Sequence, residues 1–280
     1  MFLEELITND MKKNASIITF LRARGFFIDE TDGHYFLSDN ATVGDYEYLK
    51  KGLNEYQLGT IKKTGEFGRS SRRVWNLDFL EKSYTYETIN HEQIEIKIDD
   101  NATIDNVYAF FDEMGQNRSP EIWEKRTWRE YVIEKLPCKP NVCQLEGYVS
   151  FYVKAISSCG VYTYTACDGN HINGGAVYVG AKYPWNIWHE YIWKYIVQKN
   201  FGDITYISHG IKFFNEKSQQ EIYMKLYHIA NFLYENRRRI REIKAETLKN
   251  ITERILSYHD DEIEHFYRCE CEKILRSIEI

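Results

Sequence analysis

A thiol, a carboxylate and an imidazole follow one another closely between Cys167 and His171, with Asp168 between them. A cysteine can act as a nucleophile when a histidine lies within hydrogen-bonding reach. Three glycines between positions 169 and 175 would let the backbone approach a phosphate group. The same stretch fits a long hairpin loop that turns at Asn173 and Gly174. The spacing itself predicts no catalytic geometry, and a nucleotide-processing enzyme stays one alternative.

A second pattern of reactive types is Glu95-Ile96-Lys97, the E-x-K half of a restriction-type nuclease site. There a carboxylate holds a metal ion and a lysine steadies the attacking water, and Asp78 would be the upstream acid. Isoleucines alternate with these charged residues at 94, 96 and 98, which predicts a half-buried strand. Any such strand places both charges on its solvent side. A metal-dependent nuclease is therefore an alternative, and not the preferred interpretation.

The cysteines and histidines do not match a known metal pattern. Cys138, Cys143, Cys159, Cys167 and His171 are spaced C-x4-C and C-x7-C-x3-H, unlike the usual zinc sites. The pair His189-Glu190 begins a zincin-like pattern, but Trp and Lys follow at 193 and 194 where a histidine is needed. We therefore predict no metal ion, no cofactor and no catalytic residue.

Two basic clusters could contact phosphates. The first lies in a predicted loop from Lys62 to Arg73, next to Phe67 and Trp75, and the second is Arg237 to Arg241. The net charge of the chain is −6, which argues against a general nucleic-acid coat. Solvated surfaces are the preferred interpretation, with no direct nucleic-acid partner expected, and a nucleic-acid-binding module is the third alternative.

Composition places the chain among globular proteins. It has 280 residues, of which 43% are hydrophobic and 28% charged, and this excludes a wholly disordered chain. No apolar run reaches about 18 residues, so no membrane span is predicted. The start of the chain is acidic and lacks a basic leader, so a cytoplasmic protein is expected. Tyr and Trp are abundant, and such side chains are enriched in interface cores.

The pattern of elements predicts an α+β fold, with a mixed α/β body that contains antiparallel strands, followed by a long helical C-terminal arm. Three regions are expected, at 1–118 (N-terminal α/β), 119–216 (α+β with the Cys167–His171 loop) and 217–280 (helical arm). One expected helix ends near residue 25. The other expected helices span about 46–53, 103–114, 119–136, 142–157 and 186–201. Expected strands cover about 26–28, 34–37, 93–98, 162–167, 176–183 and 204–213.

The arm carries a narrow apolar stripe with charged residues between its members, and no Gly or Pro follows Gly210. Such a helix needs a partner surface, and we expect it to project. Near its end, Cys269 and Cys271 stand two positions apart, which turns their side chains about 200° apart on a helix. Any bridge should therefore join two chains. The predicted oligomer interface consists of Phe266, Tyr267, Cys269, Cys271 and Ile274.

An acidic, Tyr-rich body of this length followed by such an arm, with Cys269 and Cys271 near its end, resembles the phage-encoded Gabija anti-defence proteins. The match rests on these cysteines, on the arm helix from Arg237 to Ile255 and on overall length. The resemblance implies a multimeric shell that encloses a bacterial anti-phage nuclease–helicase complex and keeps it from DNA. We therefore expect a non-catalytic inhibitor in the host cytosol, with the host complex and further copies of itself as partners.

Overall fold

The computed structural model describes most of the chain in separate ranges. They are 13–38, 41–75, 81–89, 93–116, 142, 145, 147, 149–161, 163–167, 176–181, 185–202, 204–207, 210–213, 218–243, 265, 269, 272, 273 and 276. The chain forms two compact units, Met1–Phe151 and Tyr152–Ile280. The predicted boundaries after 118 and 216 both fall outside the described ranges, so the three-region division stays a prediction. The predicted helix at 119–136 also lies outside them.

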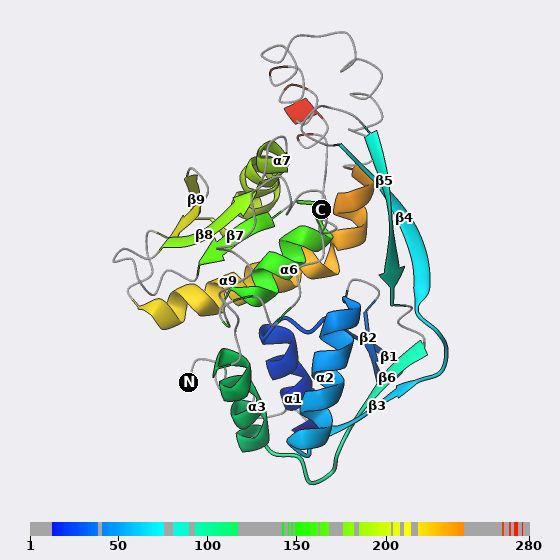
Figure 1. The fold of residues 1–280 in the computed structure, drawn as a ribbon. Helices are drawn as coiled ribbons and strands as arrows, with labels where there is room; N and C mark the ends of the chain where they lie inside the picture. Colours follow the sequence, from blue (N-terminus) through cyan, green and yellow to red (C-terminus); the bar gives the residue numbers. More distant parts are fainter. Residues whose placement is uncertain are drawn as a thin grey trace. The chain divides into compact units, whose positions relative to one another are not determined.

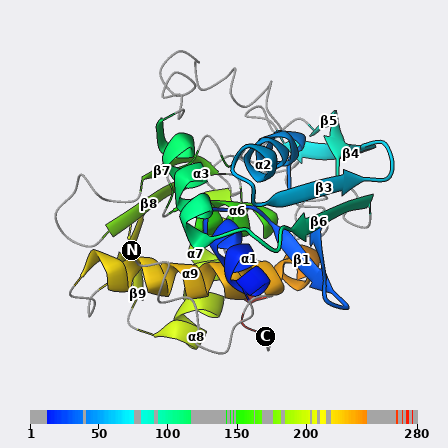
Figure 2. The ribbon, with the colours of Figure 1, turned by 90° about the horizontal axis from the view of Figure 1, so that it is seen from below.

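The first unit contains an antiparallel four-stranded sheet with three helices on one of its faces (Figures 1 and 2). Its strands, in spatial order, are β1 (Ile28–Thr31), β2 (His34–Leu37), β6 (Ile94–Ile98) and β3 (Gly59–Lys63). The helices are α1 (Lys13–Ala23), α2 (Val43–Glu55) and α3 (Ile104–Gln116). This arrangement confirms the predicted α+β class with antiparallel strands.

Local sequence accounts for the ends of these elements. α1 ends before Gly25, whose φ of 103° suits glycine. Asp32 and Gly33 both have positive φ, as the tight β1–β2 turn requires. At the start of α3, the Thr103 hydroxyl accepts from Asn106 N at 3.3 Å, so Thr103 caps the helix as predicted.

Phe110 of α3 organises the core between the helices. Its ring lies 5.9 Å from that of Phe26, 5.8 Å from Tyr48 and 5.7 Å from Tyr56, measured between centroids. It also covers Gly52 of α2, where an added Cβ would meet the ring at 2.2 Å. The helix–helix packing therefore depends on a glycine facing a fully buried phenylalanine.

Two strands of the first unit form a separate ribbon. β4 (Gly68–Trp75) pairs antiparallel with β5 (Glu81–Thr88) and with no other described strand (Figure 1). The prediction of a basic loop from Lys62 to Arg73 is therefore wrong, because β3 and β4 occupy most of it. The sequence of β4 lacks the alternation of apolar and polar residues that marks a half-buried strand.

The second unit has its own antiparallel sheet, in the order β7 (Thr163–Cys167), β8 (Ala176–Ala181), β10 (Gly210–Phe213) and β9 (Ile204–Ile207). Strands were expected at 162–167 and 176–183, and both are present. The single strand expected at 204–213 is instead two paired strands. α6 (Ser150–Ser158) leads into this unit and begins later than expected, since the described residues 142, 145, 147 and 149 are not α-helical.

The helix expected at 186–201 is not a uniform α-helix. It comprises α7 (Trp185–Tyr191), a π-helix (Ile192–Val197) and α8 (Gln198–Phe201). π-helical turns are rare and occur frequently at functional sites. The interruption places Trp193 in the core and Lys194 on the surface.

The helical arm is present, but its described first part does not project. α9 (Gln219–Glu235) is followed by further helix at 237–243. Ile222, Leu226, Ile229 and Leu233 are buried inside the second unit. There the Cys159 thiol donates to the carbonyl oxygen of Leu233 at 3.5 Å. The expectation of a projecting stripe is therefore wrong for 219–243, because the stripe packs against its own unit. No described helix is both long and apolar enough to cross a membrane.

Candidate functional site

The predicted Cys167–His171 loop is described only at its first residue. Cys167 ends β7 and lies opposite Tyr178 of β8 in the backbone register. Asp168 and His171 lie outside the described residues. Because β7 and β8 are antiparallel neighbours, the segment between them connects two adjacent strands, as the hairpin interpretation requires. The catalytic interpretation of this loop stays untested.

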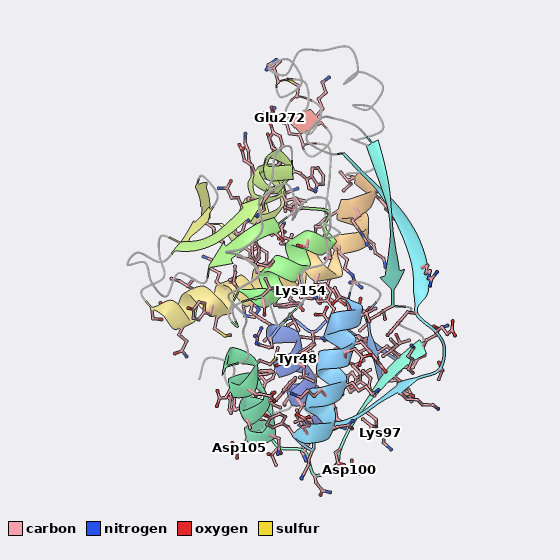
Figure 3. The ribbon with its side chains drawn as sticks, viewed as in Figure 1. Tyr48, Lys97, Asp100, Asp105, Lys154 and Glu272 are labelled. Atoms are coloured by element: carbon pink, nitrogen blue, oxygen red, sulfur yellow. The ribbon has the colours of Figure 1, made fainter. Side chains whose placement is uncertain are left out.

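The E-x-K pattern lies where the sequence predicts it, on the uncovered face of the first sheet. Ile94, Ile96 and Ile98 are buried, whereas the side chain of Glu95 is 39% exposed. Lys97 lies on the outer side of the sheet (Figure 3). Asp78, the predicted upstream acid, is outside the described residues.

Glu95 is engaged by a neighbouring strand. His34 Nδ1 lies 2.8 Å from Glu95 Oε1, and the His34 side chain is 63% exposed. Exposed ion pairs contribute little to stability, with a median of about 0–1 kcal/mol. Across the described residues, no three His, Cys, Asp or Glu side chains gather in a way that could hold a metal ion. The geometry around Glu95 is that of a solvated hydrogen bond on an open sheet face.

The basic residues near position 62 adjoin the ribbon. Lys62, Lys63 and Arg69 are exposed. Lys63 Nζ stands 3.6 Å from the centroid of the Phe67 ring, a cation–π contact. Phe67 in turn packs edge-on against Tyr46 of α2, with centroids 5.3 Å apart. The segment just before β4 thus contacts α2 through the ring of Phe67.

The β4–β5 ribbon is an element that the sequence patterns did not predict. Its backbone register spans eight residue pairs, from Gly68 opposite Thr88 to Trp75 opposite Glu81. An isolated two-stranded ribbon is at best marginally stable in water. No other described strand pairs with its outer edges, whose backbone N–H and C=O groups could therefore pair with a partner. These features make the ribbon a candidate surface for contact with another macromolecule.

The second basic cluster is not a continuous basic surface. Arg237 is buried, with Nη1 donating to Tyr234 O at 2.8 Å and its guanidinium 3.9 Å from the Tyr234 ring centroid. Arg239 is exposed and pairs with Glu242 at 3.5 Å. Arg237 therefore hydrogen-bonds to the last turn of α9 and packs in the core.

A polar cluster that the sequence did not predict lies in the core of the second unit. Tyr152 Oη is 2.8 Å from His189 Nε2, and Trp193 Nε1 donates to the same nitrogen at 3.1 Å. Trp193 Nε1 also donates to Tyr152 Oη at 2.5 Å. An indole nitrogen can only donate, so His189 Nε2 is the acceptor in its contact with Trp193.

This cluster is structural. Tyr152, His189 and Trp193 are each at most 1% exposed, so the three rings stabilise the start of the π-helix from inside. His189 and Trp193 are four positions apart, a helical spacing that could have been noticed in the sequence. The zincin-like His189-Glu190 pair thus has its histidine engaged by core partners.

The described C-terminal residues contact the π-helix. The Tyr195 hydroxyl donates to Glu272 Oε1 at 2.8 Å, and the Arg276 guanidinium also binds this carboxylate. The hydrogen bond from Tyr195, helped by the charge of Arg276, holds the pKa of Glu272 below its ordinary value. Glu272 and Arg276 are thereby held against Tyr195 of the same unit.

Of the five predicted interface residues, the structure describes only Cys269. Its thiol is free and half-buried, and Sγ lies 3.7 Å from His265 Nε2. Phe266, Tyr267, Cys271 and Ile274 lie outside the described residues, so the predicted interface stays a prediction.

The described structure thus defines an α+β protein with a buried polar core in one unit and an open sheet face and a ribbon in the other. No protein-family model matches the chain, and comparisons with curated proteins and with solved structures give no significant match.

Proposed function

We propose that this protein is a non-catalytic, phage-type inhibitor that binds and encloses a bacterial Gabija nuclease–helicase complex and blocks its access to DNA. It acts in the host cytosol and assembles with copies of itself. The proposal rests on the sequence resemblance set out above and on the surfaces just described. No residue is assigned a catalytic role.

The observation that carries the protein-binding part is the β4–β5 ribbon. Eight backbone pairs hold its strands together, while neither four-stranded sheet continues it. Because a free ribbon of this kind is marginal, a surface that covers it would stabilise it. A large protein interface would bury the ribbon, and a strand of the partner could pair with its outer edge.

The experiment tests binding with purified, tagged nuclease–helicase complex from the host. Arg69→Glu combined with Arg72→Glu should weaken capture at least about tenfold, because like or unpaired charge at an interface core is costly. The matched control is Lys97→Glu with Lys199→Glu, which changes charge equally at exposed positions outside the ribbon and its base and should bind like wild type. If the wild-type protein captured no more nuclease–helicase complex than an unrelated acidic protein does, the result would contradict the proposed partner.

A second candidate function is nucleic-acid binding through the same ribbon. The major groove of DNA admits a two-stranded antiparallel ribbon, and Arg69 with Lys62 and Lys63 places exposed positive charge at its base. Affinity that falls steeply with salt, as expected when several phosphates are contacted, would favour this candidate. Weak, salt-insensitive association with DNA would favour the inhibitor.

A further inference from the structure

The described end of the arm brings together two side chains that are good ligands for soft divalent cations. His265 and Cys269 are four positions apart in helical conformation, a spacing that puts both on one face. His265 is exposed and Cys269 is half-buried, so solvent ions reach both. The distance from His265 Nε2 to Cys269 Sγ is 3.7 Å.

This distance is close to that between two ligands of one zinc ion. Zinc sits about 2.0–2.1 Å from a histidine nitrogen and about 2.3 Å from a thiolate sulfur, with tetrahedral angles between ligands. Such a geometry separates nitrogen and sulfur by about 3.5 Å. Pairs of ligands four residues apart on a helix are a recurrent zinc-binding arrangement. The pair therefore needs only a small side-chain adjustment to bind an ion.

We propose that His265 and Cys269 form half of a Zn²⁺ site, and that the same pair from a second copy completes it. Structural zinc sites take four ligands, and among the residues described here no third candidate ligand lies with these two. Two-fold symmetry of a dimer supplies the missing two. This second half of the inference rests on the self-association proposed above, whereas binding by the pair does not.

Binding has a defined proton balance. His265 coordinates through the Nε2 lone pair and keeps its proton on Nδ1. Cys269 binds as the thiolate, so each thiol releases one proton when the metal–sulfur bond forms. Two copies bind one ion as two histidines and two thiolates, and no oxidant is involved. The site is thus distinct from a disulfide, which removes two electrons from the thiols.

The test uses the full chain, reduced and stripped of metal, with Co²⁺ and Zn²⁺ as probes. Wild type should bind one ion per two chains, show thiolate-to-cobalt charge-transfer absorption, and double in mass on adding metal. Cys269→Ser should abolish the absorption, and His265→Ala should weaken binding at least about tenfold, since loss of even a supporting partner costs about ten- to a hundredfold. His228→Ala, an exposed histidine on α9, is the matched control and should bind like wild type.

Four results would overturn the inference. Cobalt absorption unchanged in Cys269→Ser would exclude this thiol as a ligand. If Cys271→Ser weakened metal binding as much as Cys269→Ser does, the two-copy site would be excluded. Binding of one ion per chain with no change in mass would exclude it as well. Reversal of the dimer by EDTA supports the zinc site, whereas reversal by reductant alone contradicts it. Capture of the nuclease–helicase complex is measured separately, so failure of the proposed function is distinguishable.

Discussion

Replacing Asp45 with alanine should destabilise the first unit more than any other single cap substitution among the described helices. Asp45 is fully buried. Its Oδ2 accepts from Thr42 N at 2.8 Å in a capping box at the start of α2. Its Oδ1 accepts from Val142 N at 2.7 Å, which ties the helix to a segment 97 residues later in the chain.

The magnitude follows from these two bonds. Loss of a helix cap costs about 0.5–2 kcal/mol. Leaving the buried Val142 N–H unsatisfied costs about 1–3 kcal/mol, and hydrogen bonds to charged groups are at the strong end. We expect a loss of about 2–5 kcal/mol in the free energy of unfolding. This is a large part of the about 5–15 kcal/mol that holds an ordinary domain together.

A second capping box in the same chain provides the control. At the start of α9, Glu221 Oε2 accepts from Ser218 N at 2.9 Å, and both residues are exposed. Glu221→Ala should therefore cost only about 0.5–1 kcal/mol. The assay is urea unfolding followed by circular dichroism, with hydrogen exchange over 43–55 to assign the loss to α2. Equal losses in the two variants would refute the argument that burial and the Val142 bond decide the cost.

Three further predictions concern packing and the arm. Gly59→Ala should lower the free energy of unfolding by about 3–5 kcal/mol, because φ is 153° and an added Cβ would lie 2.1 Å from a carbonyl oxygen of β6. The control is Gly33→Ala, where φ is 79° and the surrounding space is open, and it should cost about 1 kcal/mol. Trp193→Phe should cost about 2–4 kcal/mol in thermal unfolding, because it removes the donor of two buried hydrogen bonds and leaves a cavity; a loss below that of Tyr195→Phe would contradict this. Since the pKa of Glu272 is lowered, its contact with Tyr195 should be intact above the ordinary carboxyl pKa and be lost as pH falls through the lowered value. The protection factors of the C-terminal segment in hydrogen exchange, which correct for the slower intrinsic exchange in acid, should therefore fall in acid for wild type, and Glu272→Gln should remove this extra acid sensitivity.

Elements whose signal is local could be predicted from the sequence. The alternation at 94–98 gave a half-buried strand, and the threonine at 103 gave a helix start. Gly25 marked the end of the first helix. In each case the residues that decide the structure are within a few positions of one another, so periodicity and capping rules apply.

Elements decided by distant partners could not be predicted in this way. β4 has no apolar face and is a strand because β5 pairs with it. The stripe of α9 looked unpartnered because the residues that cover it, such as Cys159, are far away in sequence. Arg237 looked like surface charge, but it is buried, and its guanidinium contacts the ring of Tyr234 and a backbone carbonyl oxygen.

The candidate surfaces show the same division. The exposed positions of Glu95 and Lys97 followed directly from strand alternation. The hydrogen bond between Glu95 and His34 required knowing that β2 and β6 are neighbours, which no local rule gives. The pair His265 and Cys269 was visible as a spacing, but only the distance between its atoms makes it a candidate site.

The most direct test of the central claim is a titration of DNA cleavage by the purified nuclease–helicase complex with this protein. A non-catalytic inhibitor that encloses the complex should reduce cleavage linearly to zero at a fixed molar ratio, independent of preincubation time, with one large species in mass photometry. Loss of cleavage at amounts far below that of the complex, growing with time, would show turnover and contradict the account. Full cleavage at excess protein, with no species larger than the separate components, would contradict it equally.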